Sequence, residues 1–337
     1  MAQPLDKNPH NSFLGCFTKI VCFATLFLIF VGGEVTSHSA GLSVPDWPLS
    51  YGMLFPPMVG GVFYEHGHRM VATVVGFLTL CLAILLQYLE PQSWLRKLGF
   101  WTLGAVILQG ILGGITVKFF LPTPVSVSHA VLAQTFLILT VILAYGESRE
   151  RTSREPGDEA DPRVFRLFII FTALIYLQLI LGAVMRHTAS GLAIPDFPKM
   201  GDRWFPPFDS SMLAWINDWR FMNNYESVTL HQVGIHFLHR LMAGILAGFL
   251  IWINLTTFLR QNVAPRIAKT ILAIDGLVLL QISLGILTVW TQKAPTMTSL
   301  HVVTGAATLA LSVLLVLRAA PVTIPRFQTV LFHPSAI

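Results

Sequence analysis

The stretch Tyr64-Glu65-His66-Gly67-His68-Arg69 opens a long apolar run, and the related stretch Ile235-His236-Phe237-Leu238-His239-Arg240 opens another run further along the chain. Each stretch places a His-Arg pair near the start of a segment apolar enough to cross a membrane. Ionisable side chains are costly inside a bilayer and usually mark function. Two more histidines, His129 and His301, begin two further apolar runs. These four histidines, in two matched sets, are the centre of the predicted structure.

The composition is that of an integral membrane protein. Of the 337 residues, 54% are hydrophobic and 12% are charged, and the mean hydropathy is +0.66. Soluble domains usually carry about 25% charged residues. The net charge of +5 does not indicate nucleic-acid binding, because most Lys and Arg lie in short loops, where they set membrane topology. Cys16, Cys22 and Cys81 lie in or beside apolar runs, so no disulfide is expected.

The predicted fold is an all-α integral membrane protein with eight transmembrane helices. Each helix is expected where an apolar run reaches the roughly 20 residues that a bilayer crossing needs. The expected spans are residues 13–33, 66–88, 98–118, 126–145, 164–185, 231–255, 267–290 and 299–317.

The sequence repeats itself in loops as well as in helices. Gly41-Leu-Ser-Val-Pro-Asp46-Trp47-Pro48 returns as Gly191-Leu-Ala-Ile-Pro-Asp196-Phe197-Pro198, and Leu108-Gln109-Gly-Ile-Leu-Gly113 returns as Leu280-Gln281-Ile-Ser-Leu-Gly285. Chance similarity of membrane segments does not preserve the order of loops and helices. We therefore predict two tandem pseudo-symmetric four-helix bundles, 1–147 and 164–337, joined by a polar cytoplasmic linker at 148–163.

Loop charges predict the orientation. With the N-terminus inside, 14 Lys and Arg fall in cytoplasmic segments and 6 in outer loops, so both termini are expected in the cytoplasm and the four histidines near the outer leaflet. The inner set is Lys7, Lys19, Arg96, Lys97, Arg149, Arg151, Arg154, Arg163, Arg166, Arg260, Arg266, Lys269, Arg318 and Arg326; the outer set is Lys118, Arg186, Lys199, Arg203, Arg220 and Lys293.

The four histidines are candidate axial ligands of heme iron. Neutral imidazole is a common heme ligand, and facing helices of a four-helix bundle often supply a pair. A small residue follows each histidine by four positions, which leaves room for a porphyrin or for ordinary helix packing. These small residues are Ala72, Ala133, Ala243 and Gly305.

Charged residues beside the histidines have two interpretations each. Arg69 and Arg240 are candidate partners of heme propionates, or they extend to the membrane interface. Glu65 lies three residues before His68, where the second half has His236. This carboxylate either handles protons beside a cofactor or simply favours a helix N-terminus. The Pro-Asp-aromatic-Pro loops either cap the site or brace the helix ends, with Asp46 and Asp196 as turn residues.

The chain resembles the heme A synthase family in these motifs. The likeness covers nearly the whole chain and rests on Gly41–Pro48, on the Glu65-x-x-His68-Arg69 element and on the segment that ends at His187. Many bacterial members carry a cysteine pair in an outer loop, which this sequence lacks. The second outer loop, 186–230, is the longer one and contains Trp204, Trp215 and Trp219.

The resemblance implies an oxidoreductase that converts the C8 methyl group of heme O into the formyl group of heme A for terminal oxidase biogenesis. It implies heme b on His239 and His301, substrate heme O on His68 and His129, and Glu65 as the catalytic residue. It also implies a bacterial cytoplasmic membrane location, with heme O synthase and cytochrome oxidase assembly factors as candidate partners, and a homo-oligomer as a further candidate.

Two other functions use the same residues. A quinol-linked cytochrome with two b-type hemes would need the four histidines but not Glu65. A transporter with duplicated halves would use the histidines for protons, but it is expected to have broken helices near mid-membrane, whereas the ionisable residues here gather at one side. His38 and His187, in outer loops, and His66 and His236 have no assigned role.

Overall fold

A computed structural model describes residues 11–155, 157–259 and 263–321, and this part of the chain forms ten helices. Eight of them are long and apolar enough to cross a membrane, which confirms the predicted all-α membrane fold. Lys7, Arg260 and Arg326, used in the charge count, lie outside the described residues. The helices are α1 Ser12–Ser37, α2 Gly61–Leu89, α3 Ser93–Lys118, α4 Thr123–Gly146, α5 Arg149–Thr152, α6 Pro162–His187, α7 Ser210–Met222, α8 Leu230–Phe258, α9 Pro265–Trp290 and α10 Pro295–Ala319.

Local sequence signals explain where these helices begin. Proline stands at the first or second position of α4, α6, α9 and α10, where its missing N–H costs nothing. A capping box opens α8, because Thr229 and Gln232 satisfy each other's backbone N–H groups. Helix α2 begins at Gly61, five residues before the predicted span. Glu65 and His66 therefore lie inside the helix rather than at its edge.

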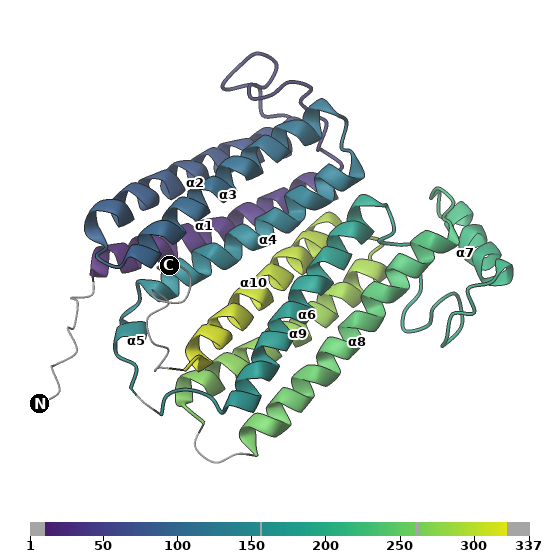
Figure 1. Cartoon of the computed structure of the whole chain (residues 1–337). Helices are drawn as coiled ribbons and strands as arrows, with labels where there is room; N and C mark the ends of the chain where they lie inside the picture. Colours follow the sequence, from purple (N-terminus) through teal and green to yellow (C-terminus); the bar gives the residue numbers. More distant parts are fainter. Residues whose placement is uncertain (1–10, 156, 260–262, 322–337) are drawn as a thin grey trace, which may run out of the picture.

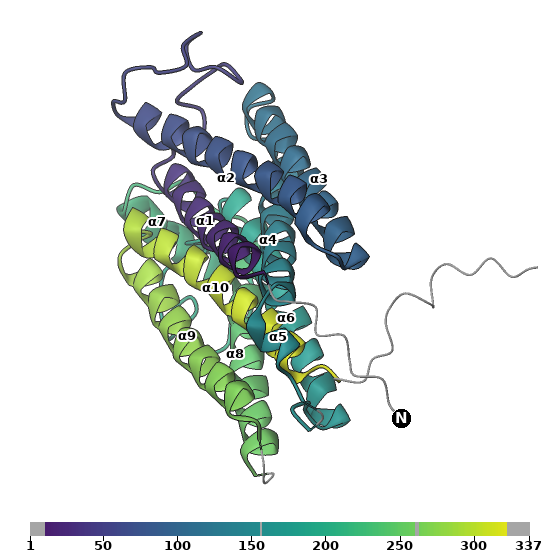
Figure 2. The same ribbon diagram turned by 90° about the vertical axis from the view of Figure 1, so that its left-hand side faces the viewer.

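The eight long helices run side by side along one direction (Figure 1). Helices α1–α4 gather on one side, and α6, α8, α9 and α10 on the other. Helix α10 packs against α1, α4, α6 and α9, so it lies at the centre of the molecule (Figure 2). We call the end that carries segments 38–60 and 188–229 the loop end, and the opposite end, near α5, the linker end.

Two apolar cores hold the two groups. The larger core runs from α4 through α6, α8 and α9 to α10, and includes Phe168, Phe171 and Ile271. The smaller core joins α1, α2, α3 and α4 through residues such as Leu14 and Leu82. Many other apolar side chains point outward, which suits helices surrounded by lipid. Cys16, Cys22 and Cys81 are free thiols, as expected.

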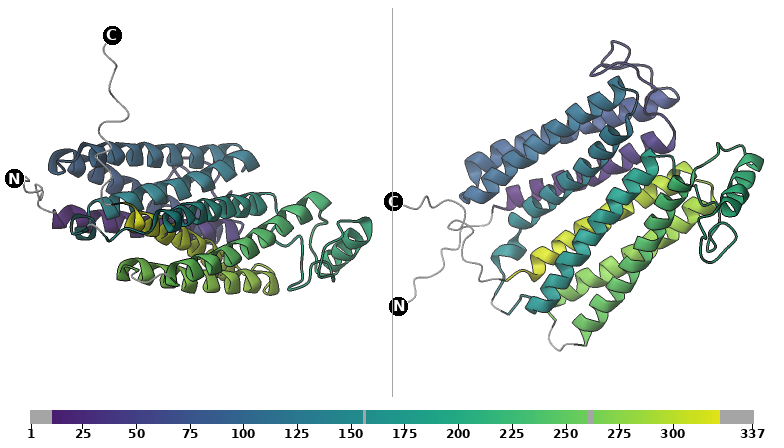
Figure 3. Two further views of the ribbon diagram at one scale, coloured as in Figure 1. Left: turned by 60° about the horizontal axis from the view of Figure 1, so that its bottom comes forward. Right: turned by 45° about the vertical axis from the view of Figure 1, so that its right-hand side comes forward.

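The long loop before α8 contains a helix that was not predicted. Helix α7 stands apart from the long helices at the loop end (Figure 3). The Asp209 side chain caps its first turn by accepting a hydrogen bond from Met212 N–H. Near its other end, the buried Arg220 donates to the carbonyl oxygens of Leu192 and Glu226. The tryptophans of this segment had suggested only that the loop covers a site or lies at the interface.

The predicted linker binds the end of α10. Arg154 donates to the Leu317 and Ala320 carbonyl oxygens, and Arg318 pairs with Glu150 at 2.6 Å. These contacts attach the segment between α4 and α6 to the last helix.

Two buried carboxyl groups meet at the linker end. Glu90 follows α2 and Glu147 follows α4, and both side chains are almost fully buried. Burial, and then the neighbouring Glu90 carboxylate, raises the pKa of Glu147 to about 8. Glu147 therefore keeps a proton at neutral pH that the unfolded chain would release.

Glu147→Gln should stabilise the protein at alkaline pH. Because the folded-state pKa is raised, the wild type loses stability as pH rises from the ordinary value of 4.5 through about 8. Glutamine cannot ionise, so the variant should unfold at a higher temperature than the wild type at about pH 9 and at nearly the same temperature at about pH 5. Thermal unfolding in detergent measures this difference in unfolding temperature between variant and wild type. The exposed Glu155→Gln is the control. A difference that stays constant with pH would contradict the raised pKa of Glu147.

Candidate heme sites and the loops beside them

Each of the four histidine rings lies against a glycine of the preceding long helix. A Cβ atom built on that glycine would lie 3.1–3.4 Å from the ring Cε1 atom, so a larger residue would push the ring away. The glycine therefore lets the two helices approach and fixes the position of the imidazole. The four pairs are Gly32 with His68, Gly113 with His129, Gly182 with His239, and Gly285 with His301.

Glutamine side chains accompany three of these pairs, one helical turn before the glycine. Gln109 and Gln178 donate to the backbone carbonyl oxygens of His129 and His239, at 2.9 and 3.0 Å. The Gln281 amide nitrogen lies 3.4 Å from Nε2 of His301, whose Nδ1 is 3.1 Å from the Gln281 carbonyl oxygen. The first helix carries Leu28 at the matching position. The amides hold the helix that carries each histidine.

The structure brings His239 and His301 together. Their ring centroids are 6.4 Å apart and their planes meet at 67°. Two imidazoles on opposite sides of one metal ion have centroids about 6 Å apart, because each metal–nitrogen bond is about 2 Å long and each ring adds about 1 Å. This pair therefore fits bis-imidazole coordination of one iron.

Several polar atoms around the rings are buried without a hydrogen-bond partner. They include Nδ1 of His68, His129 and His239. The side-chain oxygens of Gln109, Gln178 and Gln281 are also unpaired. Buried polar atoms are normally satisfied, so the unpaired glutamine oxygens mark places where a bound group or water belongs, whereas the Nδ1 atoms face the neighbouring glycines. Together with the glycines and the His239–His301 spacing, these atoms fit a heme-binding protein.

The small residues four positions after each histidine are less informative. A Cβ atom on Gly305 would lie 3.0 Å from both the Gln281 amide nitrogen and a Leu179 methyl group. Side chains therefore fill the space beside Gly305, which is the ordinary packing interpretation of that residue. Room for a porphyrin beside Ala72, Ala133 and Ala243 stays a prediction.

Glu65 fastens the first loop to α2. One carboxylate oxygen accepts the Val44 N–H at 2.8 Å, and the other pairs with Arg69 at 2.7 Å. Arg69 in turn donates to the carbonyl oxygens of Asp46 and Leu49, both at 2.7 Å. Glu65 and Arg69 thus hold one end of the loop through its backbone.

His236 makes the matching contacts in the second loop. Its Nδ1 lies 3.0 Å from the Ile194 N–H nitrogen and its Nε2 lies 3.2 Å from Nε of Arg240. A neutral imidazole has one acceptor nitrogen, so the ring accepts from only one of these two donors at a time. Arg240 donates to the carbonyl oxygens of Ile194 and Asp196. Glu65 and His236 therefore occupy equivalent places in two copies of one contact pattern, which we call the loop clasp. Contact of Arg69 or Arg240 with heme propionates stays a prediction.

The Asp residues of the loops shape their turns, as expected. Asp46 accepts hydrogen bonds from the N–H groups of Tyr51 and Gly52, and Asp196 accepts from Gly201 and Asp202. The bond from Gly52 is the main reason that the pKa of Asp46 lies below its usual value.

The first loop also reaches the helix beside His129. The Trp47 ring lies so close to Gly114 that a Cβ atom there would be 2.8 Å from it. His66, the neighbour of Glu65, bonds the Ser50 hydroxyl at 2.8 Å. The loop therefore spans from α2 to α3 over the end of the helices that carries His68 and Gly113, consistent with a cap over the site.

His38 contacts residues of the first helix group, whereas His187 lies where the two groups meet. His38 stacks on Tyr64 with ring centroids 3.9 Å apart. The His187 carbonyl oxygen accepts a bond from Thr123. Arg186, next to it, donates to Gly33 O and Ser37 Oγ of α1. These contacts join α4 and α1 to α6.

Comparison with known proteins assigns the family. Residues 16–313 match the COX15-CtaA family, described as cytochrome oxidase assembly protein. The chain belongs to this family. It is 25% identical over 296 residues to "Heme A synthase" of Alkalihalophilus pseudofirmus, covering 86% of this chain and 91% of that protein. It is 29% identical over 310 residues to "Heme A synthase" of Pelagibacter ubique, covering 82% and 87%.

Family membership agrees with the resemblance drawn from the Glu65–Arg69 element and the repeated loops. Sequence reasoning missed the glycines against the rings, although a signal was present. Gln-x-x-x-Gly occurs three times at matching places, as Gln109–Gly113, Gln178–Gly182 and Gln281–Gly285. It also missed the loop clasp, because the backbone partners of Glu65 and His236 leave no pattern in the sequence.

Proposed function

We propose that this protein is a heme A synthase that oxidises the C8 methyl group of heme O to the formyl group of heme A. The observation that carries the proposal is the set of four histidines, each positioned against a glycine, within a chain of this family. Heme O is the substrate, and terminal oxidase assembly is the purpose. Heme O synthase and oxidase assembly factors are candidate partners, and a homo-oligomer is a further candidate.

The second half, 164–337, would hold a resident heme b. His239 and His301 would hold its iron, supported by their 6.4 Å centroid separation and by Gly182 and Gly285 behind the rings. When bound, this heme supplies one-electron redox chemistry. The protein's own contribution is to fix both imidazoles through close helix contacts.

The first half, 1–147, would bind heme O and carry the reaction. His68 and His129 would hold its iron, and the first loop would cover it through Trp47 and the loop clasp. Oxidising a methyl group to a formyl group removes protons as well as electrons. Glu65, one helical turn before His68, would be the group that handles these protons, and its carboxylate is held in place by Val44 N–H and Arg69.

The loop end would face the outside of the bacterial cytoplasmic membrane, with both termini inside. The charge count supports this orientation, because the Arg-rich segment at α5 belongs to the opposite end.

Replacing His239 or His301 with Ala should remove most of the low-spin heme b from the purified protein, because a six-coordinate iron needs both imidazoles. Optical spectra of the membrane-extracted protein measure the loss, and the amount of protein in the membrane is measured alongside. His231→Ala, at the exposed start of α8, is the matched control. A double His239→Ala/His301→Ala variant that keeps the wild-type spectrum would refute the ligand assignment.

Glu65 can be tested against its structural counterpart. Glu65→Gln and Glu65→His both remove the carboxylate, and histidine is the residue that stands at the matching place of the second loop clasp. Both variants should insert normally and keep heme b, but leave heme O or a partly oxidised product, measured by pigment extraction from cells that also produce heme O.

His236→Gln is the control, because it disturbs a clasp of the same geometry without removing a carboxylate. It should still yield heme A. If Glu65→His makes heme A at the wild-type rate, Glu65 serves only the clasp and is not the catalytic residue.

The orientation has its own test. Leu54→Cys, on the exposed first loop, should react with a membrane-impermeant thiol reagent added to intact cells. Thr152→Cys, in α5 at the linker end, should react only after the cells are broken. Labelling of the unsubstituted protein gives the background from Cys16, Cys22 and Cys81, which is subtracted. The reverse pattern would overturn the orientation.

A further inference from the structure

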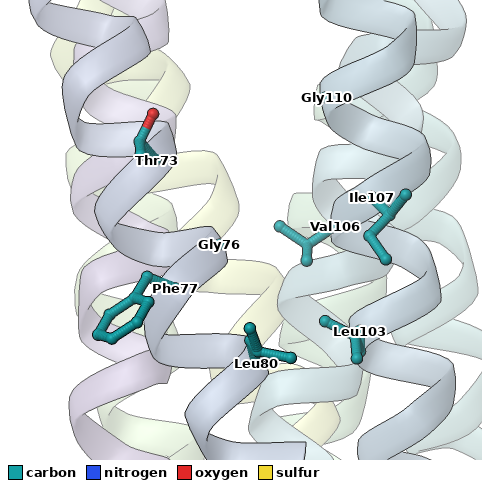
Figure 4. Close-up of a pocket in the computed structure, with 8 residues that line it drawn as sticks. All are labelled: Thr73, Gly76, Phe77, Leu80, Leu103, Val106, Ile107 and Gly110. Carbon is teal, nitrogen blue, oxygen red and sulfur yellow. The ribbon is translucent and has the colours of Figure 1, made fainter.

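An apolar groove lies between α2 and α3, beside the first pair of histidines. Its volume is about 450 Å³, within the range of small-molecule sites. Figure 4 shows Thr73 and Gly110 at one end and Leu80 and Leu103 at the other. The lining extends over seven residue steps of each helix, and at about 1.5 Å per residue the groove is about 10 Å long. The lining is almost wholly apolar.

The groove begins at the level of the candidate iron ligands. Gly110 directly follows Gln109, whose side chain bonds the backbone of His129. It lies about one helical turn before Gly113, which contacts the His129 ring. Thr73 lies little more than one turn beyond His68. The groove therefore leads from the His68–His129 site toward the middle of the membrane-spanning helices.

Two glycines keep the groove open. Neither Gly76 on α2 nor Gly110 on α3 has any atom within 4 Å of the place where a Cβ would stand. Phe77 and Ile107 are more than half exposed, so the groove also opens sideways, toward the region of lipid. A chain lying in it would contact both helices and could extend into the bilayer.

The matching positions of the second half do not reproduce this groove. Ala247 and Ile282 stand where the first half has Gly76 and Gly110. Asp275 stands in place of Leu103, and its side chain accepts a hydrogen bond from Asn254 at 2.9 Å, which links α8 to α9. The residues that form the apolar groove beside the histidine pair assigned to the substrate are therefore not repeated in the second half.

We propose that the α2–α3 groove binds the isoprenoid side chain of the substrate heme. Heme O differs from protoheme in carrying this long apolar chain in place of a vinyl group. The chain is chemically matched to the lining, and burying it against two helices would anchor the macrocycle between His68 and His129. The inference rests on the proposed function, because the substrate is taken from it.

The test compares heme O with protoheme, which lacks the side chain. Spectroscopic titration of each into the purified protein gives two dissociation constants, and the wild type should bind heme O more tightly. Gly110→Leu should weaken heme O binding about tenfold or more and leave protoheme binding unchanged, because excluding two or three methylene groups has an effect of this size. Gly110→Ala should give a dissociation constant for heme O between those of the wild type and Gly110→Leu.

Gly248→Leu is the matched control. Gly248 is a glycine of α8 that also has open space beyond its Cβ position, but it lies outside the groove. This variant should bind both hemes as the wild type does. Equal weakening of heme O and protoheme by Gly110→Leu, or no weakening of either, would overturn the proposal and would fit a groove that holds only membrane lipid.

This experiment separates the groove from the proposed activity. Binding is measured without turnover, so a protein that prefers heme O and loses this preference in Gly110→Leu supports the groove even if it forms no heme A. A wild type that binds the two hemes equally would overturn the groove even if heme A is formed.

Discussion

The close contact between an imidazole ring and a glycine on the preceding long helix is the constraint on which the arrangement depends. An imidazole within a membrane helix is costly unless it binds something, and it can bind an iron only if its position is fixed. Glycine at residues 32, 113, 182 and 285 lets the helices approach until the ring has little freedom. The helix pairs that form these contacts, α1–α2, α3–α4, α6–α8 and α9–α10, are also among the most closely packed in the molecule.

The loop clasp shows how two different side chains can do the same structural work. Glu65 accepts the Val44 N–H with one oxygen and a hydrogen bond from Arg69 with the other. A neutral imidazole has one acceptor nitrogen, so His236 accepts from only one of its two neighbouring donors. The second loop is therefore held beside a side chain that is not an acid, so holding a loop of this kind does not by itself require a carboxylate.

Much of this could be read from the sequence, and the rest could not, for physical reasons. Hydropathy determines where helices cross a membrane, so the eight spans were predictable, and so were the candidate histidines near their ends. Helix α7 was missed because it is short and amphipathic and lies in a loop whose aromatic residues suit several environments. The groove was missed because it depends on how far apart α2 and α3 lie at Gly76 and Gly110, and glycine in a membrane helix more often signals close packing.

Glu65 and the two groove glycines distinguish the first half, since the matching positions of the second half hold His236, Ala247 and Ile282. The histidine–glycine contacts recur at matching places in both halves. The second half in turn has the longer loop, with helix α7. A resident cofactor needs only to be held, whereas a substrate must enter, be oriented and lose protons. An acid and an apolar groove beside one histidine pair are what a substrate site would add to the frame that the proposed function assigns to a resident heme.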